Sequence, residues 1–409
     1  MESREEILAQ DQVDKRYRIL MIAPTPFFAD SGSHVRILEE ALILRRLGSR
    51  ITICTYHNGR NVNRLAIERT MGIPWWKDCE AISSWYKLAF DALLSFKSLA
   101  VALRKRPDVI HAHLHEGALI GYVLSKIQGL PLVFDFQGSL TSEMIDHNFL
   151  HRENFFYGPL RWMEEVIDSL PKAVITSSQH AAELLREEFH CPPEKIHIVP
   201  DCVNPDFFAP EAIDEGARLH LKAQLGIPSE RKVVIYLGLL AEYQGIGLLM
   251  QAARRLVEIR SDLHFLIMGY PAVDHYQKLA ATLGIAEHAT FTGRVPYSEA
   301  PLHLSLGDIA VAPKVSATEG NGKLLNYMAM ELPIVAFDTP VNREYLGDLG
   351  VYASFGDPES LALKIAYLLE DGAKAIQLGR KLREQAVASY STEIMGRKIL
   401  KIYEDATGG

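Results

Sequence analysis

Short apolar runs alternate along the chain with stretches that have helical periodicity. The runs Arg18-Ile-Leu-Met-Ile-Ala23 and Arg50-Ile-Thr-Ile-Cys-Thr55 predict buried strands, and the residues between them, His34 to Leu47, predict a helix that ends at Gly48. The alternation continues as far as the run Ile196-His-Ile-Val199. Because strands that alternate with helices are typical of a parallel sheet covered on both faces, the pattern predicts a doubly wound α/β fold.

The alternation is interrupted at residues 201–210, where prolines and turn-forming residues gather, and it starts again at Lys232. A chain of 409 residues is longer than one hydrophobic core usually serves, so two domains are expected. We divide the chain into a polar tail (1–16), an N-terminal Rossmann-like domain (17–205), a C-terminal Rossmann-like domain (206–385) and a last helix (386–409) expected to cross back to the N-terminal domain. Ligands of such sheets bind outside the carboxyl ends of the strands, so the active site is expected in the cleft between the domains.

Composition and charge exclude several classes of protein. The net charge of −8 argues against a nucleic-acid-binding protein, which needs a basic face. The four cysteines form no Cys-x-x-Cys pair, which predicts reduced thiols and no zinc framework. The N-terminus is charged, and no apolar run approaches the roughly 18 residues of a membrane span. These features predict a cytoplasmic protein.

Glycines, a carboxylate and an ammonium group gather at one predicted junction between a strand and a helix. The strand Gly307–Pro313 leads to Glu319-Gly-Asn-Gly-Lys323, and a helix follows. Glycines let a backbone approach a ligand closely, and the first N–H groups of a helix favour an anion. A nucleotide P-loop is rejected, because Ala317 stands where its first glycine would lie and Leu324 replaces the magnesium-binding Ser or Thr.

Polar residues also follow two predicted strands of the N-terminal domain. His111, His113 and His115 alternate at the end of one strand; metal binding stays open, although contact with a ligand in the cleft is favoured for His113. Asp135 and Gln137 leave the next strand, where contact with an acceptor or sugar and a structural role are equally open.

Aromatic and basic residues are mixed between positions 75 and 106, for example in Trp75-Trp-Lys77 and Trp85-Tyr-Lys87. The favoured interpretation is a core helix with a solvated basic end. The alternative is peripheral contact with an anionic membrane surface, which would suit a lipid-linked acceptor.

Three segments resemble the family 4 (group 1) retaining glycosyltransferases. Residues 24–34 resemble the N-terminal glycine loop of the family, residues 198–210 its interdomain linker, and residues 318–335 its donor-binding motif. The resemblance implies the GT-B fold, in which two Rossmann-like domains face each other across a cleft. It also implies a nucleotide-diphosphate sugar as co-substrate, a glycan or lipid-linked acceptor, no cofactor and no obligatory metal.

The resemblance assigns roles to individual residues. Glu319 matches the first glutamate of the donor motif and would face the sugar as the catalytic residue. Acceptor or sugar contacts fall on His113, Asp135 and Gln137. The donor-binding positions are Gly32, Ser33, Gly238, Gln244, Gly320, Asn321, Gly322, Lys323, Leu324 and Asn326.

Several of these positions depart from the family pattern. Asn326 replaces the second glutamate, Leu239 and Gln244 replace the two cations that clamp the diphosphate, and Gln137 replaces a histidine. We therefore expect Lys323 to take over the donor phosphate. The alternative is a catalytically degenerate GT-B protein that binds a sugar or nucleotide, or serves as a scaffold. A weaker alternative is a GT-B epimerase or phosphorylase.

Overall fold

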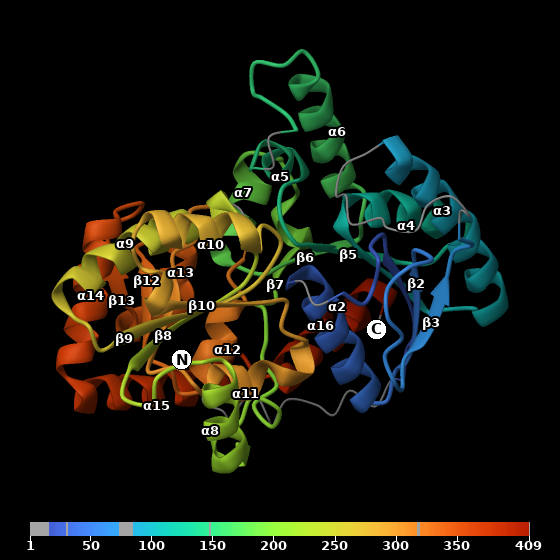
Figure 1. Cartoon of the computed structure of the whole chain (residues 1–409). Helices are drawn as coiled ribbons and strands as arrows, with labels where there is room; N and C mark the ends of the chain where they lie inside the picture. The colour runs from blue at the N-terminus through green and yellow to red at the C-terminus, as the bar shows by residue number, and fades with distance from the viewer. Residues whose placement is uncertain (1–15, 30–31, 73–84, 147–148, 317–319, 409) are drawn as a thin grey trace.

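Two parallel sheets, each covered by helices on both faces, organise the computed structural model (Figure 1). The structure describes residues 16–29, 32–72, 85–146, 149–316 and 320–408. The predicted class, two Rossmann-like α/β domains, is confirmed. No helix in these ranges is long and apolar enough to cross a membrane.

The N-terminal sheet has seven parallel strands in the order β3-β2-β1-β4-β5-β6-β7. Its strands are β1 (Arg18–Ala23), β2 (Arg50–Thr55), β3 (Ala66–Arg69), β4 (Val109–His113), β5 (Leu132–Phe136), β6 (Ala173–Thr176) and β7 (Ile196–Ile198). The central strands are apolar on both faces because helices cover both. The register pairs His113 of β4 with Asp135 of β5, so the two polar residues lie side by side at the carboxyl edge.

Helices pack on the two faces of this sheet through alternate strand residues. On one face, Ile19 and Met21 pack with α2 (Gly32–Arg46) and α16 (Thr392–Thr407). On the other face, Leu20 and Ile22 pack with the remaining helices. Those helices are α3 (Trp85–Lys105), α4 (Leu114–Gln128), α6 (Tyr157–Ser169) and α7 (Gln179–Glu187), and the short α5 (Leu140–Asp146) packs beside α6.

The C-terminal sheet has six parallel strands in the order β10-β9-β8-β11-β12-β13. They are β8 (Lys232–Leu237), β9 (Leu263–Met268), β10 (Ala289–Gly293), β11 (Ile309–Ala312), β12 (Ile334–Phe337) and β13 (Val351–Ala353). The helices of this domain are α8 (Glu215–Gln224), α9 (Ile246–Ile259), α10 (Val273–Thr282), α11 (Ala300–Leu304), α12 (Lys323–Ala329), α13 (Pro340–Leu346), α14 (Pro358–Glu370) and α15 (Gly372–Ser389).

The last helix, α16, joins the core of the N-terminal domain. Met395, Ile399 and Tyr403 are buried against α2 and the N-terminal sheet. Gly396 permits this approach, since a Cβ there would lie 2.7 Å from a side-chain carbon of Ile43. One side of α16 is therefore buried in the N-terminal domain.

Candidate active site

The predicted donor motif, residues 318–335, starts in the loop between β11 and α12, at the carboxyl edge of the C-terminal sheet. The buried ammonium of Lys314 donates a hydrogen bond to the carbonyl oxygen of Gly320 at 2.7 Å and so fixes the path of this loop. Glu319, the predicted catalytic residue, lies outside the described residues.

Three of the predicted donor-binding residues converge beside this loop. Nζ of Lys323 donates to Oε1 of Gln244 at 2.9 Å and lies 4.5 Å from the ring centre of Tyr236. A Cβ at Gly238 would lie 2.7 Å from the same Nζ, so the missing side chain makes room for the ammonium. The end of β8, the turn before α9 and the start of α12 thus bring Gly238, Gln244 and Lys323 to one place.

The other residues of the motif have different environments. Asn321 is buried, and its Nδ2 donates to Oδ1 of Asn342 at 2.8 Å, so this amide fastens the loop to α13. The side chain of Leu324 is buried in the domain core, which leaves only its backbone for a ligand. Asn326 is half-buried on α12.

The predicted acceptor contacts come together in the N-terminal domain. Nδ1 of His113 lies 3.1 Å from Oδ2 of Asp135, and Nε2 of Gln137 donates to the same oxygen at 2.8 Å. His113 and Asp135 are fully buried, whereas Gln137 is half-buried. Gln137 is therefore the member of this group that is most accessible to a ligand. Gly32 and Ser33, the predicted glycine-loop positions, form the first turn of α2, where Gly32 is exposed.

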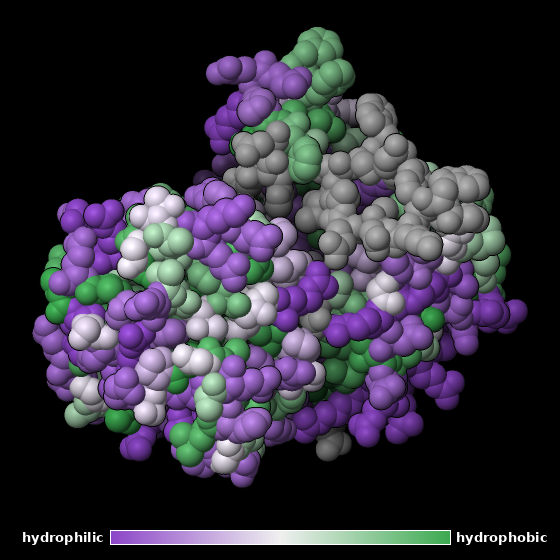
Figure 2. Space-filling model, viewed as in Figure 1, coloured by the Kyte–Doolittle hydropathy of each residue, from purple (hydrophilic) through white to green (hydrophobic). Residues whose placement is uncertain are grey.

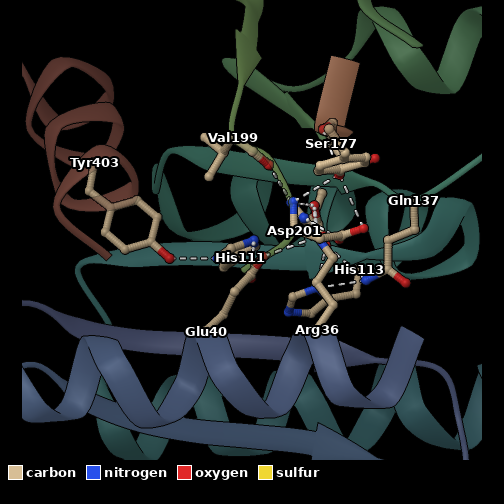
Figure 3. A network of polar contacts seen from close by, with 11 residues as sticks. Arg36, Glu40, His111, His113, Gln137, Ser177, Val199, Asp201 and Tyr403 are labelled. Atoms are coloured by element: carbon tan, nitrogen blue, oxygen red, sulfur yellow. Dashed lines mark hydrogen bonds and ion pairs between the residues drawn. The ribbon is translucent and has the colours of Figure 1, made fainter. Parts of the chain in front are cut away.

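A buried arginine that the sequence did not single out joins these residues to the interdomain linker (Figure 3). Arg36 of α2 binds Asp135 through Nε at 3.0 Å and Nη2 at 2.8 Å. Its Nη1 donates to Asp201 at 2.9 Å, and its Nε lies 3.2 Å from Glu40. One guanidinium therefore meets three carboxylates.

Asp201 also contacts the donor loop of the other domain. Its Oδ2 would lie 2.9 Å from a Cβ at Gly320 and 3.1 Å from a Cβ at Gly322. The hydroxyl of Tyr345, on α13, donates to the carbonyl oxygen of Ser177 at 3.2 Å. The two glycines let the donor loop close against the linker, which places it next to the Arg36 network.

Burial and charge pull the pKa values of this network in opposite directions. Burial would raise the pKa of Asp135, but Arg36 and His113 hold it well below its ordinary value. Burial, helped by the charge of Asp135, raises the pKa of Glu40 well above its ordinary value although Arg36 opposes the shift. Burial and His113 lower the pKa of His111 well below its ordinary value. The network thus favours an ionised Asp135, a protonated Glu40 and a neutral His111.

Two buried groups of histidines and carboxylates have spacings that could suit a metal ion. In the first, Arg36 already bridges Glu40 and Asp135, and Nδ1 of His111 lies 2.5 Å from the hydroxyl of Tyr403. In the second, Nε2 of His115 lies 3.2 Å from Asp168 beside Glu164, and these carboxylates raise the pKa of His115 to about 9 against the effect of burial. In the structure, Arg36 is the cation closest to the carboxylates of the first group and His115 is paired with Asp168 in the second; the expectation of no metal stays a prediction.

Replacing Glu40 by glutamine is expected to stabilise the protein at alkaline pH. A carboxyl whose pKa is raised by folding contributes stability that is complete below the unfolded pKa of about 4.3 and is lost as pH rises through the folded pKa. The amide can accept from Arg36 but cannot ionise, so Glu40→Gln avoids that loss. Chemical unfolding at pH 4.5 and 8.5 measures the difference; a variant that is less stable at both pH values would contradict the assignment.

The chain matches two family models that together span both domains. Residues 31–207 match the model "Glycosyltransferase Family 4", and residues 218–386 match "Glycosyl transferases group 1". The two Rossmann-like domains and these matches define a GT-B glycosyltransferase. The chain belongs to the group 1 glycosyltransferases of family 4.

Curated relatives and solved structures agree with this family. The chain is 27% identical to the alpha-D-kanosaminyltransferase of Streptomyces kanamyceticus, over 72% of this chain and 77% of the relative. It is 26% identical to a D-inositol 3-phosphate glycosyltransferase of Corynebacterium aurimucosum, over 73% of this chain and 72% of the relative.

Among solved structures, the sucrose-phosphate synthase of Thermosynechococcus elongatus has a TM-score of 0.79 at 17% identity, with 95% of this chain and 99% of that chain covered. HepE of Anabaena, solved in complex with UDP-glucose, has a TM-score of 0.75 at 16% identity, with 94% and 99% covered. At these identities the structures show the fold.

Proposed function

We propose that this glycosyltransferase moves a sugar, with retention of anomeric configuration, from a nucleotide-diphosphate sugar to a glycan or lipid-linked acceptor. The observation that carries the proposal is the position of Lys323: its ammonium lies at the carboxyl edge of the C-terminal sheet, against Gly238 and Gln244. A cation at that edge suits the diphosphate of a donor.

The C-terminal domain would bind the donor. Lys323 would bind a phosphate oxygen, and Asn326 would offer its amide to the ribose. Glu319 would bind sugar hydroxyls and stabilise positive charge at the anomeric carbon. The leaving phosphate oxygen would take the proton of the acceptor, which gives retention without an obligatory metal or cofactor.

The N-terminal domain would bind the acceptor. The support is the half-buried Gln137, which lies at the carboxyl edge of β5 and hydrogen-bonds to Asp135. Closure of the cleft excludes water from the reacting groups and aligns donor with acceptor. We place the protein in the cytoplasm, in peripheral contact with the inner face of the membrane when the acceptor is lipid-linked.

A second candidate function, donor binding without turnover, has one specific observation in its favour. Leu239 and Gln244 stand where the family has cations, and Oε1 of Gln244 accepts the hydrogen bond from Lys323. A donor phosphate must compete with that amide for the ammonium.

A panel of UDP-, GDP- and ADP-sugars tests the proposal and separates the two candidates. We expect one donor class to raise the melting temperature and to be slowly hydrolysed. Glu319→Gln should still bind that donor but turn it over roughly 10²-fold more slowly, because a charged group at the reacting centre is lost. Binding without turnover in the wild type would favour the second candidate, and no shift with any donor at millimolar concentration would contradict both.

A further inference from the structure

Helix α6 turns acidic side chains toward the protein and apolar side chains toward solvent, which is the reverse of an ordinary surface helix. Its buried side carries Glu164 and Asp168 with Ile167, whereas its outer side carries Trp162, Met163 and Val166, and Trp162 is 66% exposed. The loop before it exposes Phe155 and Phe156, and Phe155 is 86% exposed. Figure 2 shows hydrophobic side chains gathered at the top of the molecule, where Figure 1 places α6. A helix that is apolar toward solvent needs a partner for that side.

Two further helices on the same face of the sheet, α4 beside α6 and α3 beside α4, also expose apolar side chains. On α4, which packs against α6, Leu119, Val123 and Ile127 recur at intervals of four residues and are exposed. On α3, which packs against α4, the exposed apolar residues include Leu88 and Phe96. We call the exposed apolar side chains of α3, α4 and α6 the apolar face. Most of the large apolar side chains exposed in the described part of the chain belong to it or to the loop before α6.

Charges on and around the apolar face are distributed unevenly. Two acidic residues of these helices are engaged within the protein: Glu116 pairs with Lys87, and Asp91 accepts from the hydroxyl of Tyr56 at 2.6 Å. Glu164 and Asp168 are buried. Of the described acidic residues of the three helices, only Glu165, half-buried on α6, remains. Glu153 is exposed in the loop before α6.

Cations lie where the three helices end. Lys105 and Arg106 are exposed at the end of α3, and Lys126 is exposed near the end of α4. Because α3, α4 and α6 lead into the neighbouring parallel strands β4, β5 and β6, their ends share one edge of the sheet. A hollow of about 990 Å³ opens at this edge; its lining includes Arg16, Lys126, Lys172 and Lys195, together with Asp108 and apolar residues.

We propose that the apolar face of α3, α4 and α6 docks on an anionic lipid bilayer, with the cations at the helix ends and in the hollow binding lipid headgroups. Apolar side chains that enter the interface beside lysine and arginine are the features that seat a protein on an anionic membrane. An anionic bilayer offers the basic rim a complementary charge and the apolar face an apolar layer at the same time.

The position of the apolar face suits the acceptor side of the reaction. Helix α5 begins three residues after Gln137, and the loop with Phe155 and Phe156 connects α5 to α6. The loop with Phe155 and Phe156 and the α6 part of the apolar face therefore follow the proposed acceptor residues closely in the chain. This inference deepens the proposed function, from which it takes the lipid-linked acceptor, but its test needs neither donor nor acceptor.

Vesicle flotation of the full chain tests the proposal. We expect wild-type protein to float with phosphatidylcholine vesicles that contain phosphatidylglycerol, and less with phosphatidylcholine alone. The triple variant Phe96→Gln/Val123→Gln/Trp162→Gln removes one exposed apolar side chain from each helix and should lower the partition constant more than about tenfold. The matched control Leu219→Gln/Ile259→Gln/Leu363→Gln changes equally exposed residues of the C-terminal domain and should float like the wild type.

The charge variant Lys105→Gln/Arg106→Gln supplies a second, independent measurement. It should weaken flotation with anionic vesicles about tenfold and leave flotation with neutral vesicles unchanged. The proposal is overturned if wild-type protein does not float with anionic vesicles, or if the control loses as much as the triple variant. A dimer in the ultracentrifuge that the triple variant lacks, with no flotation, would assign the apolar face to a second copy instead. Donor hydrolysis, measured without vesicles, should be the same in all variants. If the wild type hydrolyses no donor, that result contradicts the proposed reaction and leaves the membrane proposal unaffected.

Discussion

Replacing Arg36 by methionine is expected to lower the free energy of unfolding by about 3 to 5 kcal/mol, because it leaves the carboxylates of Asp135 and Asp201 without their shared cation. Asp135 is fully buried. Burial alone would raise its pKa, but Arg36 holds this pKa well below its ordinary value. Without the guanidinium, Asp135 must take up a proton or draw water into the core. Either change should also loosen the contact between the linker and the donor loop.

Denaturant unfolding at neutral pH measures this effect, and Arg46→Met is the matched control. Arg46 lies on the same helix with a side chain that is 63% exposed, so its loss should change stability little. Adding Asp135→Asn to Arg36→Met should recover part of the loss, since it removes the strongest unpaired charge. If Arg36→Met is as stable as the control, the network does not stabilise the fold.

The fold could be predicted because each strand and helix leaves its own local pattern of apolar residues, and these patterns alternate along the chain. The buried strands read from apolar runs, such as Arg18–Ala23 and Lys232–Leu237, have the bounds seen in the structure. The predicted helix His34–Leu47 differs from α2 by a residue or two at each end. The short strand β3 (Ala66–Arg69) was missed because it is half-exposed at the edge of the sheet and has only a weak apolar signal.

The candidate site could be predicted only where its residues follow strands. His113 and Asp135 were predicted because each lies at or near the end of a buried strand, and the parallel register then brings them together. Arg36 gave no such signal: it lies within a helix, and an arginine there is usually solvated. Its three carboxylate partners are 4, 99 and 165 residues away along the chain. Contacts of that range depend on how the whole N-terminal domain folds, which a local pattern does not show.

The proposed membrane contact illustrates a different limit of prediction from the sequence. The mixture of aromatic and basic residues between positions 75 and 106 indicated a membrane surface or a core helix, and residues 73–84 lie outside the described residues. The structure adds that α3 lies beside α4 and that α6 turns its apolar side outward. The periodicity of one helix cannot show which of its sides is buried when both sides carry apolar residues.

Replacing Lys323 by alanine is expected to weaken donor binding by about 1.5 to 3 kcal/mol, roughly 10- to 150-fold in Kd, because a charge-assisted contact with the diphosphate is lost. The two other cations with which the family binds the diphosphate are replaced here by Leu239 and Gln244. The loss should therefore fall on donors with a diphosphate, while a nucleoside without phosphates should bind the variant and the wild type equally well.

Calorimetric titration of the donor and of its nucleoside distinguishes this binding role from a structural one. Lys323→Arg keeps the charge and should retain part of the affinity, although its larger head must fit against Gly238 and Tyr236. Lys232→Ala is the control, because Lys232 begins β8 at the opposite edge of the same sheet and pairs with Asp308. Gln244→Ala removes the amide that holds Nζ of Lys323 at 2.9 Å, so it should leave donor affinity unchanged or raise it. If Lys323→Ala lowers the melting temperature but not the donor affinity, the ammonium only supports the packing of Tyr236, and the donor phosphate must be bound elsewhere.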